Sequence, residues 1–587
     1  MSWRDAVSRL SQSTRSSWFL WALLAATVAV RLPCIERPLV GNFATKNVVY
    51  AMIARNWARG TASAWYPTLD CLASGERSLH MLEWPASAYL SGWLWKLLGG
   101  SLDAWGRGTA IAFTTASVAI LFLLVRRWHG AMAASAAAAV LAFSPVSIIY
   151  GQSFMLEASL VFFSLVGLLG FDRWLGEGRR MWLMIGGVGL ALMLLTKIYM
   201  LTMLLPLAGM VWAAARETDG SAARRRRLAA LAVAFATIPA CAWYLHAWQV
   251  AGPESPWQER IFYSVRQSAA VHLPNWLLGT AGFYQGLLAD LSGVVLTPLG
   301  LALCVIGACQ RGARRHMLWC GAMLIVVLLL PLKFSKLNYY YLAVLPPLCV
   351  LAGLGAEWII ERLRLGRAAI TCLLVGGCLM SARFAVGPAF RIPAEDRGVV
   401  EAARAVRRLT APDEPVVTMH GSTIDLLYYC DRRGWAVSPE RQDLIETLEK
   451  CRNQGARYAV LVGENDPFGK PPHRNLSAGR GEGLSLRRAS GGLTAKGSAP
   501  WVFANARMVA AGENYRIYEL SRRRAQVQVP QRGKRLANVP PSARNTANPG
   551  HKVAQGREQS DGGHAGRGGQ VGKEPHQRRI ATADAQP

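Results

Sequence analysis

The sequence predicts an all-α membrane protein that crosses a bilayer about eleven times and carries a small α/β domain near its C-terminus. Of its 587 residues, 52% are hydrophobic, and the mean hydropathy of +0.19 exceeds what a soluble surface allows. Apolar runs long enough to cross a hydrocarbon core of roughly 30 Å recur along the chain. Arginine clusters separate these runs, as the positive-inside rule predicts for membrane helices.

The formal net charge of +29 has two sources in this pattern. Basic residues crowd the ends of the apolar runs, and the C-terminal tail is basic as well. Because membrane orientation explains the first group, we expect membrane lipids and no nucleic acid as partners.

The first span is predicted at 17–32 and is preceded by Arg4, Arg9 and Arg15. No small-residue cleavage site follows it, which favours an anchor over a removable signal peptide. Arginines before the first span place the N-terminus in the cytoplasm.

The next apolar segment, 85–98, is too short to span and carries Trp93, Trp95 and Lys96. Tryptophan prefers the membrane interface, so we expect an interfacial helix here. The other spans are then predicted at 107–125, 131–149, 155–171, 181–196, 199–215, 228–247, 286–309, 317–333, 339–359 and 368–385. If 85–98 does not span, every strong arginine cluster falls in a cytoplasmic loop. The C-terminal domain is then expected on the outer side of a cytoplasmic (inner) membrane.

The predicted domains are a membrane domain at 1–390, an extracytoplasmic α/β domain at 391–520 and a basic disordered tail at 521–587. In the α/β domain the patterns predict helices at 394–409 and 444–453 and strands at 415–419, 458–462 and 515–520. Disulfides between Cys34 and Cys71, and between Cys430 and Cys451, stay open alternatives for an oxidising compartment.

Charged residues recur where the predicted topology places the outer face. The carboxylates are Glu83, Glu157 and Asp70, and the cations and the tyrosine beside them are Lys197, Lys336, Lys46 and Tyr340. Lysines at helix ends often only snorkel, and tyrosines form interfacial belts. Their convergence, however, suits a reaction that needs cations for a phosphate and a carboxylate base for a sugar acceptor.

Lys46 opens a segment, 46–57, in which Val49, Met52 and Ile53 share one helical face. We therefore expect a short amphipathic helix just outside the first span, with simple packing at the membrane surface as its alternative role. Glu83 precedes Pro85 and opens the interfacial helix, so it could equally be only a helix cap.

At these positions the chain resembles the GT-C superfamily, nearest to dolichyl-phosphate-mannose protein mannosyltransferases and lipid A aminoarabinose transferases. The resemblance rests on Tyr50-Ala51-Met52-Ile53-Ala54-Arg55, Leu82-Glu83-Trp84-Pro85, Leu195-Thr196-Lys197 and Ser335-Lys336-Leu337-Asn338-Tyr339-Tyr340-Tyr341. It implies an inverting glycosyltransferase that moves a hexosyl or pentosyl group from a polyprenyl-phosphate donor to a glycan, lipid or protein acceptor. No cofactor is implied with certainty, and a divalent metal stays open.

The chain departs from that family where an Asp-Glu pair begins the first-loop helix and supplies the presumed base. Lys46 and Asn47 occupy these positions. Three alternatives stay open: another carboxylate replaces the base, with Glu83 first, then Glu157 or Asp70; the acceptor needs no base; or transferase activity is lost. The rival functions are a lipid or sugar transporter and a non-catalytic envelope-assembly protein.

Overall fold

The structure is a computed structural model that describes residues 18–41, 43–214, 220–271, 275–363, 376, 386–387, 390–421, 423–463 and 506–520. The predicted eleventh span at 368–385 lies outside these residues except for 376, and the predicted tail at 521–587 lies wholly outside them. The described residues belong to one compact unit.

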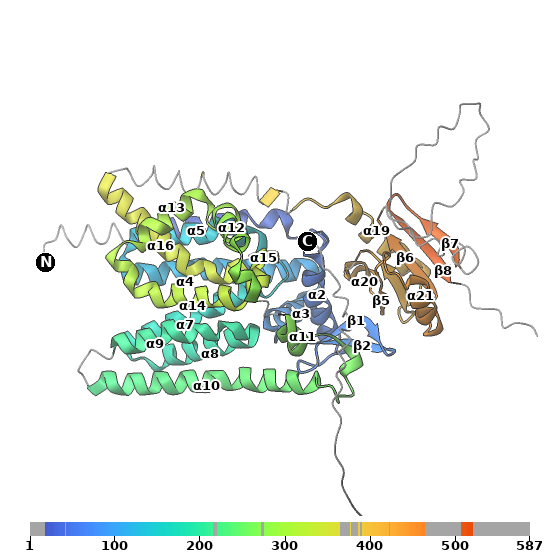
Figure 1. Ribbon diagram of the computed structural model, residues 1–587, viewed down its shortest axis with the longest axis horizontal. Coiled ribbons are helices and arrows are strands. Elements are labelled where there is room, and N and C mark those ends of the chain that lie inside the picture. The colour runs from blue at the N-terminus through green and yellow to red at the C-terminus, as the bar shows by residue number, and fades with distance from the viewer. Residues whose placement is uncertain are drawn as a thin grey trace, which may run out of the picture. The chain divides into compact units, whose positions relative to one another are not determined.

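Apolar helices occupy the other ten predicted span positions (Figure 1). They are Trp18–Cys34, α4 (Leu102–His129), α5 (Ala131–Phe143) with α6 (Pro145–Tyr150), α7 (Glu157–Glu177), α8 (Arg180–Thr196), α9 (Leu204–Ala213) with the preceding turn Ile198–Met203, α10 (Gly220–Val250), α12 (Ala281–Asp290) with α13 (Thr297–Ala308), α14 (Met317–Leu329) and α16 (Tyr341–Leu363). Within the described chain, five helices are long and apolar enough to cross a membrane, or six if the bent pair around Leu296 counts as one. The number eleven therefore stays a prediction.

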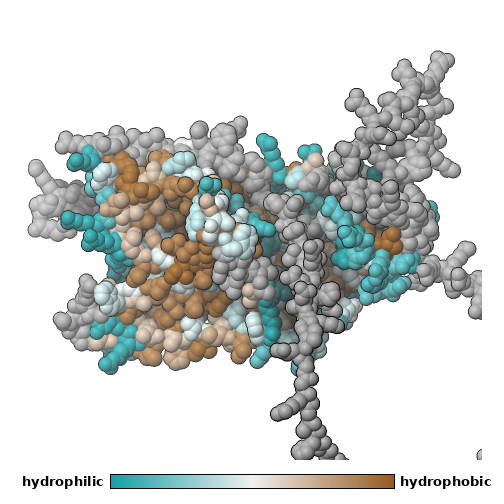
Figure 2. All heavy atoms as spheres, viewed as in Figure 1, coloured by the Kyte–Doolittle hydropathy of each residue, from teal (hydrophilic) through white to brown (hydrophobic). Residues whose placement is uncertain are grey.

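Hydrophobic side chains cover the helical part on the face that Figure 2 shows, and hydrophilic side chains flank them at both ends. Exposed Phe235, Leu245 and Trp212 belong to this apolar cover. Such a surface would be costly in water but matches lipid chains.

The helix predicted at 85–98 forms as α3 (Ala86–Leu98), which has 13 residues and ends at Gly99 with φ of 70°. A helix of this length is roughly 20 Å long, short of the roughly 30 Å of a hydrocarbon core. Glycine is favoured at the end because φ in the left-handed range carries no side-chain penalty there.

The helix α2 (Ala44–Ala58) confirms the helix predicted from 46 to 57 but not its surface character. Val48, Tyr50 and Ile53 are fully buried, and the buried residues run around the helix. It packs on α3, α4 and the C-terminal domain. The amphipathic interpretation was wrong because the polar residues of α2 face buried partners inside the protein.

Antiparallel packing of α7 and α8 is close because glycines lie at their contact. A side chain at Gly170 would come within 2.3 Å of the backbone of Gly186, and one at Gly189 within 2.7 Å of Gly167. Small residues let membrane helices approach closely. This packing brings Glu157, the first residue of α7, beside Lys197, which follows the last residue of α8.

One mixed sheet of eight strands has the order β3-β2-β1-β5-β4-β6-β8-β7. The strands predicted in the C-terminal domain form as β4 (Val416–Met419), β6 (Tyr458–Val462) and β8 (Tyr515–Leu520), with β5 (Gly434–Ala436) and β7 (Ala506–Ala511) in addition. Its helices are α19 (Val399–Leu409), α20 (Asp425–Cys430) and α21 (Leu444–Asn453).

The other three strands come from the loops between membrane helices. They are β1 (Thr68–Ala73), β2 (Glu76–Met81) and β3 (Ile261–Ser264). A parallel bridge between Cys71 in β1 and Gly434 in β5 joins the two groups. The sheet therefore crosses the domain boundary that we predicted at 390/391. Cys34, Cys71, Cys430 and Cys451 are all free thiols, so neither of the two open disulfides is present.

Candidate active site

Four charged side chains meet where α2, the loop after β2, α7 and the end of α8 come together. They are Lys46, Glu83, Glu157 and Lys197. The exposed fraction is 2% for Glu83, 1% for Glu157 and 5% for Lys197. We call these four residues the charged cluster.

Glu83 is the centre of the charged cluster. Its Oε1 accepts hydrogen bonds from Lys197 and, at 3.4 Å, from Lys46 Nζ, while its Oε2 lies 3.3 Å from His80 Nε2. The loop that carries Glu83 is fixed because the Trp84 amide donates to the Leu195 carbonyl at 3.0 Å. Glu83 is thus held by side chains from three separate segments and is not a simple helix cap.

The charge of Glu83 depends on these neighbours. Burial alone would raise the pKa of this carboxyl, but Lys197, Lys46 and the His80 hydrogen bond outweigh it and hold the pKa well below its usual range. Burial lowers the pKa of Lys46 and also that of His80. Glu83 is therefore ionised, and its negative charge is already shared between two lysines.

Glu157 has a different environment. Its nearest cation is Lys197, with Nζ 3.8 Å from Oε1, and neither carboxylate oxygen has a hydrogen-bond partner. Buried carboxylate oxygens normally accept hydrogen bonds, so these two are available to a hydroxyl that enters the site.

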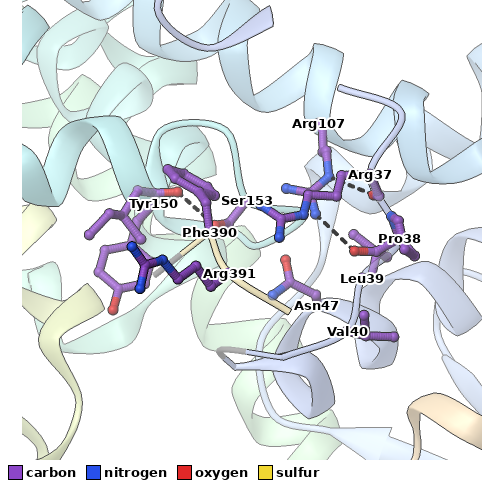
Figure 3. A pocket seen from close by; sticks show the side chains of 11 residues that line it. Arg37, Pro38, Leu39, Val40, Asn47, Arg107, Tyr150, Ser153, Phe390 and Arg391 are labelled. Carbon is purple, nitrogen blue, oxygen red and sulfur yellow. Dashed lines mark hydrogen bonds between the residues drawn. The ribbon is translucent and has the colours of Figure 1, made fainter. Parts of the chain in front are cut away.

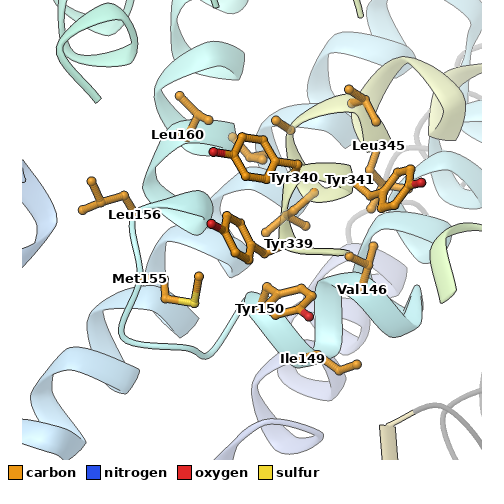
Figure 4. Packing of buried hydrophobic residues seen from close by; sticks show 14 of the residues in the cluster. Val146, Ile149, Tyr150, Met155, Leu156, Leu160, Tyr339, Tyr340, Tyr341 and Leu345 are labelled. Carbon is orange, nitrogen blue, oxygen red and sulfur yellow. The ribbon is translucent and has the colours of Figure 1, made fainter. Parts of the chain in front are cut away.

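Tyrosines lie beside the charged cluster, and Figure 4 shows Tyr150, Tyr339, Tyr340 and Tyr341 packed among buried aliphatic side chains. The rings of Tyr339 and Tyr340 stack with centroids 4.8 Å apart, and Lys197 Nζ lies 5.8 Å from the Tyr340 ring. Tyr339 also contacts Tyr150 and Phe43 edge to face. Tyr340 is thus near the charged cluster, and so is the adjacent Tyr339 of the same predicted motif.

Asp70 lies in a separate group of charges. Its Oδ2 accepts from Arg55 Nη2 at 2.7 Å, and its Oδ1 is 3.6 Å from Arg77 Nε. Arg55 also lies 3.1 Å from Asp431, which follows α20 in the C-terminal domain. Asp70 is therefore an ion-pair partner of Arg55 and Arg77. Among the described residues, no hydrogen bond or ion pair joins Asp70 to the charged cluster.

Asp431 links this second group to the exposed Arg59, with two hydrogen bonds of 2.8 and 2.9 Å. Burial would raise the pKa of Asp431, but Arg59 and Arg55 lower it to about 2. Tyr428 and Tyr429 in α20 donate to Asp103 of α4 at 2.6 Å each. The C-terminal domain therefore holds the end of α2 opposite to Lys46.

Lys336 is exposed on the turn before the paired tyrosines and has no ion pair among the described residues. Lys333, one helical turn earlier, is half-buried and hydrogen-bonds Tyr263 of β3. Tyr263 in turn stacks on His80 with centroids 6.1 Å apart. The sequence favoured Lys336 for the donor phosphate, whereas the contacts of Lys333 come from a distant strand that spacing does not reveal.

A divalent metal fits the charged cluster poorly. Lys197 occupies the position between Glu83 and Glu157, so an ammonium already neutralises the two carboxylates. The described residues contain no group of three or more histidine, cysteine, aspartate or glutamate side chains placed to hold a metal.

The fold has clear relatives among solved structures. The ArnT of Cupriavidus metallidurans bound to undecaprenyl phosphate aligns with a TM-score of 0.54 and 17% identity over 86% of this chain and 98% of that chain. Its apo state gives 0.53 and 16% over the same shares. The Archaeoglobus fulgidus oligosaccharyltransferase in its apo form aligns with a TM-score of 0.49 and 14% identity, over 76% of this chain and 69% of that chain. No curated protein sequence matches the chain.

The likeness to ArnT shows the fold class, a membrane protein in which apolar helices accompany a small sheet. More particularly, residues 84–243 match the family described as Dolichyl-phosphate-mannose-protein mannosyltransferase. The matched segment begins beside Glu83 and includes Glu157 and Lys197. The chain is thus similar to this mannosyltransferase family over the matched segment and to ArnT in its fold.

Proposed function

We propose that the protein is an inverting glycosyltransferase that moves a hexosyl or pentosyl group from a polyprenyl-phosphate donor to a glycan, lipid or protein acceptor. The observation that carries this proposal is the charged cluster, in which two carboxylates and Lys197 are buried and Lys46 is half-buried, beside a pair of tyrosines. The family match and a relative bound to undecaprenyl phosphate support the same donor class.

In this proposal the donor phosphate is held by Lys197 and Lys46, with Tyr340 beside them. Lysine binds phosphate as a compact positive charge. Glu83 positions both lysines before the donor enters, and afterwards the lysines contact both Glu83 and the donor phosphate. Lys333 is a further candidate for this role, and exposed Lys336 is a weaker one.

Glu157 is our first choice for the base, ahead of Glu83, because its oxygens are unpartnered whereas those of Glu83 are taken. The base takes the acceptor hydroxyl proton while that oxygen bonds to the anomeric carbon. The bond from this carbon to the phosphate oxygen breaks, and polyprenyl phosphate leaves with the electron pair. One displacement of this kind inverts the anomeric centre.

The Lys46-Asn47 pair is compatible with catalysis in this arrangement. Lys46 supplies charge to the phosphate, and Glu157 replaces the missing carboxylate from a different helix. Of the three alternatives for the missing aspartate, a substitute carboxylate is therefore the one we favour.

Transfer from a radiolabelled polyprenyl-phosphate sugar by the purified full-length protein tests the function. We expect label in a water-stable product together with release of polyprenyl phosphate. Movement of the intact donor across a vesicle membrane without release would instead support a transporter. Binding without either process would support an assembly protein.

We propose that the charged cluster faces the outside of a cytoplasmic membrane. This orientation rests on the arginine parity. Reporter fusions at Arg127 and Arg227 should report a cytoplasmic position, and a fusion at Arg391 an external one. The opposite pattern would place the cluster on the cytoplasmic side and overturn the proposed topology.

A further inference from the structure

A polar pocket lies beside the beginning of α2 (Figure 3). Its enclosed space is about 30 Å³, and it opens to solvent. The residues that line it include Arg37, Asn47, Arg107, Tyr150 and Arg391. They come from the first outer loop, α2, α4, α6 and the segment that leads into the C-terminal domain. We call this the arginine pocket.

The three guanidinium groups of the arginine pocket make no ion pair with an acidic side chain in the described parts of the chain. Arg107 is only 8% exposed and donates to the carbonyls of Arg37 and Pro38 at 3.3 and 3.4 Å. Asp103 interacts electrostatically with Arg107, but both carboxylate oxygens of Asp103 accept hydrogen bonds from Tyr428 and Tyr429. The arginine pocket thus carries excess positive charge.

Asn47 supplies a second and independent feature. It is 6% exposed, its amide nitrogen donates to the Phe43 carbonyl at 3.0 Å, and its Oδ1 has no hydrogen-bond partner. A buried amide oxygen without a donor is costly, and the hydroxyl of a bound sugar would satisfy it.

The arginine pocket and the charged cluster share two structural links. Lys46 and Asn47 are consecutive on α2, so their side chains leave the helix about 100° apart, and Lys46 faces Glu83 while Asn47 lines the arginine pocket. Tyr150 lines the arginine pocket and also contacts Tyr339. A ligand in the pocket would therefore lie beside the proposed reaction centre.

We infer that the arginine pocket binds an anionic sugar, with a phosphate or carboxylate on the guanidinium groups and a hydroxyl on Asn47. Guanidinium groups match such planar or tetrahedral oxyanions through paired hydrogen bonds. This inference rests on the proposed function and deepens it. Because the charged cluster takes the donor phosphate, the arginine pocket selects the acceptor, which is then an acidic glycan or phosphorylated sugar.

Binding to the full-length protein in detergent tests this inference without requiring turnover. The probes are glucose 1-phosphate and glucuronate, with glucose as the uncharged control and undecaprenyl phosphate as the probe of the donor site. We expect the two anionic sugars to bind and glucose not to bind. Replacing both exposed or half-buried arginines in R37Q/R391Q should weaken the anionic sugars about tenfold or more. Undecaprenyl phosphate should bind this variant as it binds the parent.

The matched control is R404Q/R408Q, which removes the same charge from two exposed arginines of α19. It should bind every probe as the parent does, apart from a small general effect that disappears in salt. Equal binding of the anionic sugars by R37Q/R391Q and the parent would overturn the inference. Loss of undecaprenyl phosphate in the same variant would assign the pocket to the donor and overturn it as well. Neither result would depend on whether sugar transfer is detected.

Discussion

Changing Glu157 to Gln should lower kcat by about 10²–10⁴-fold, the usual contribution of a general base. Glutamine keeps the size of the side chain but cannot accept the acceptor proton. Neither oxygen of Glu157 has a hydrogen-bond partner to lose, and only the 3.8 Å contact with Lys197 changes. We therefore expect the variant to fold and to bind donor with an affinity close to that of the parent.

The measurement is single-turnover transfer from a saturating donor, with donor affinity determined separately. E177Q is the matched control because Glu177 ends the helix that Glu157 begins and is paired with Arg173 at 2.6 Å. It should turn over like the parent. Full turnover by E157Q would remove Glu157 from the role of base, and a large loss in E83Q alone would return the role to Glu83.

Changing Lys197 to Met should have the largest effect on both stability and donor binding. The ammonium contacts Glu83 and lies 3.8 Å from Glu157, and all three side chains are at most 5% exposed. Removing one partner of a buried ion pair typically costs about 3–5 kcal/mol because it leaves a charge uncompensated. Loss of the same ammonium removes the main cation proposed for the donor phosphate.

A double variant separates these two effects. In E83Q/K197M the uncompensated charge of Glu83 is gone, so much of the stability should return, whereas affinity for undecaprenyl phosphate should stay low. K96M is the control, because Lys96 of α3 is exposed and lacks an ion pair within the described chain. If E83Q/K197M recovers both stability and donor affinity, Lys197 only neutralises Glu83 and does not bind the donor.

The positions of the helices could be predicted from the sequence because hydrophobic length is a local property. The apolar runs that became α4, α7 and α16 are visible without any tertiary information. The short α3 could be identified because its tryptophans and lysine mark an interface. The burial of α2 could not, since it depends on contacts with a domain more than 300 residues further along the chain.

Part of the candidate site could be predicted from the sequence. Glu83, Glu157 and Lys197 were identified because charged side chains at the ends of apolar runs are costly near a membrane unless they are paired or functional. Their ranking could not be refined from the sequence, because only the tertiary contacts show that the oxygens of Glu83 are taken and those of Glu157 are unpartnered. Asp70 looked equivalent in sequence but meets Arg55, a partner that spacing does not reveal.

The bridge between β1 and β5 has a practical consequence for anyone who exchanges acceptor-recognition parts between related transferases. A chimaera that replaces only residues 391–520 would place a foreign β5 against the native β1 and a foreign partner against Arg55 and Arg59. The helix that delivers Lys46 would then lose its fixed end. The interchangeable module is therefore discontinuous, and it includes the first outer loop together with the C-terminal segment.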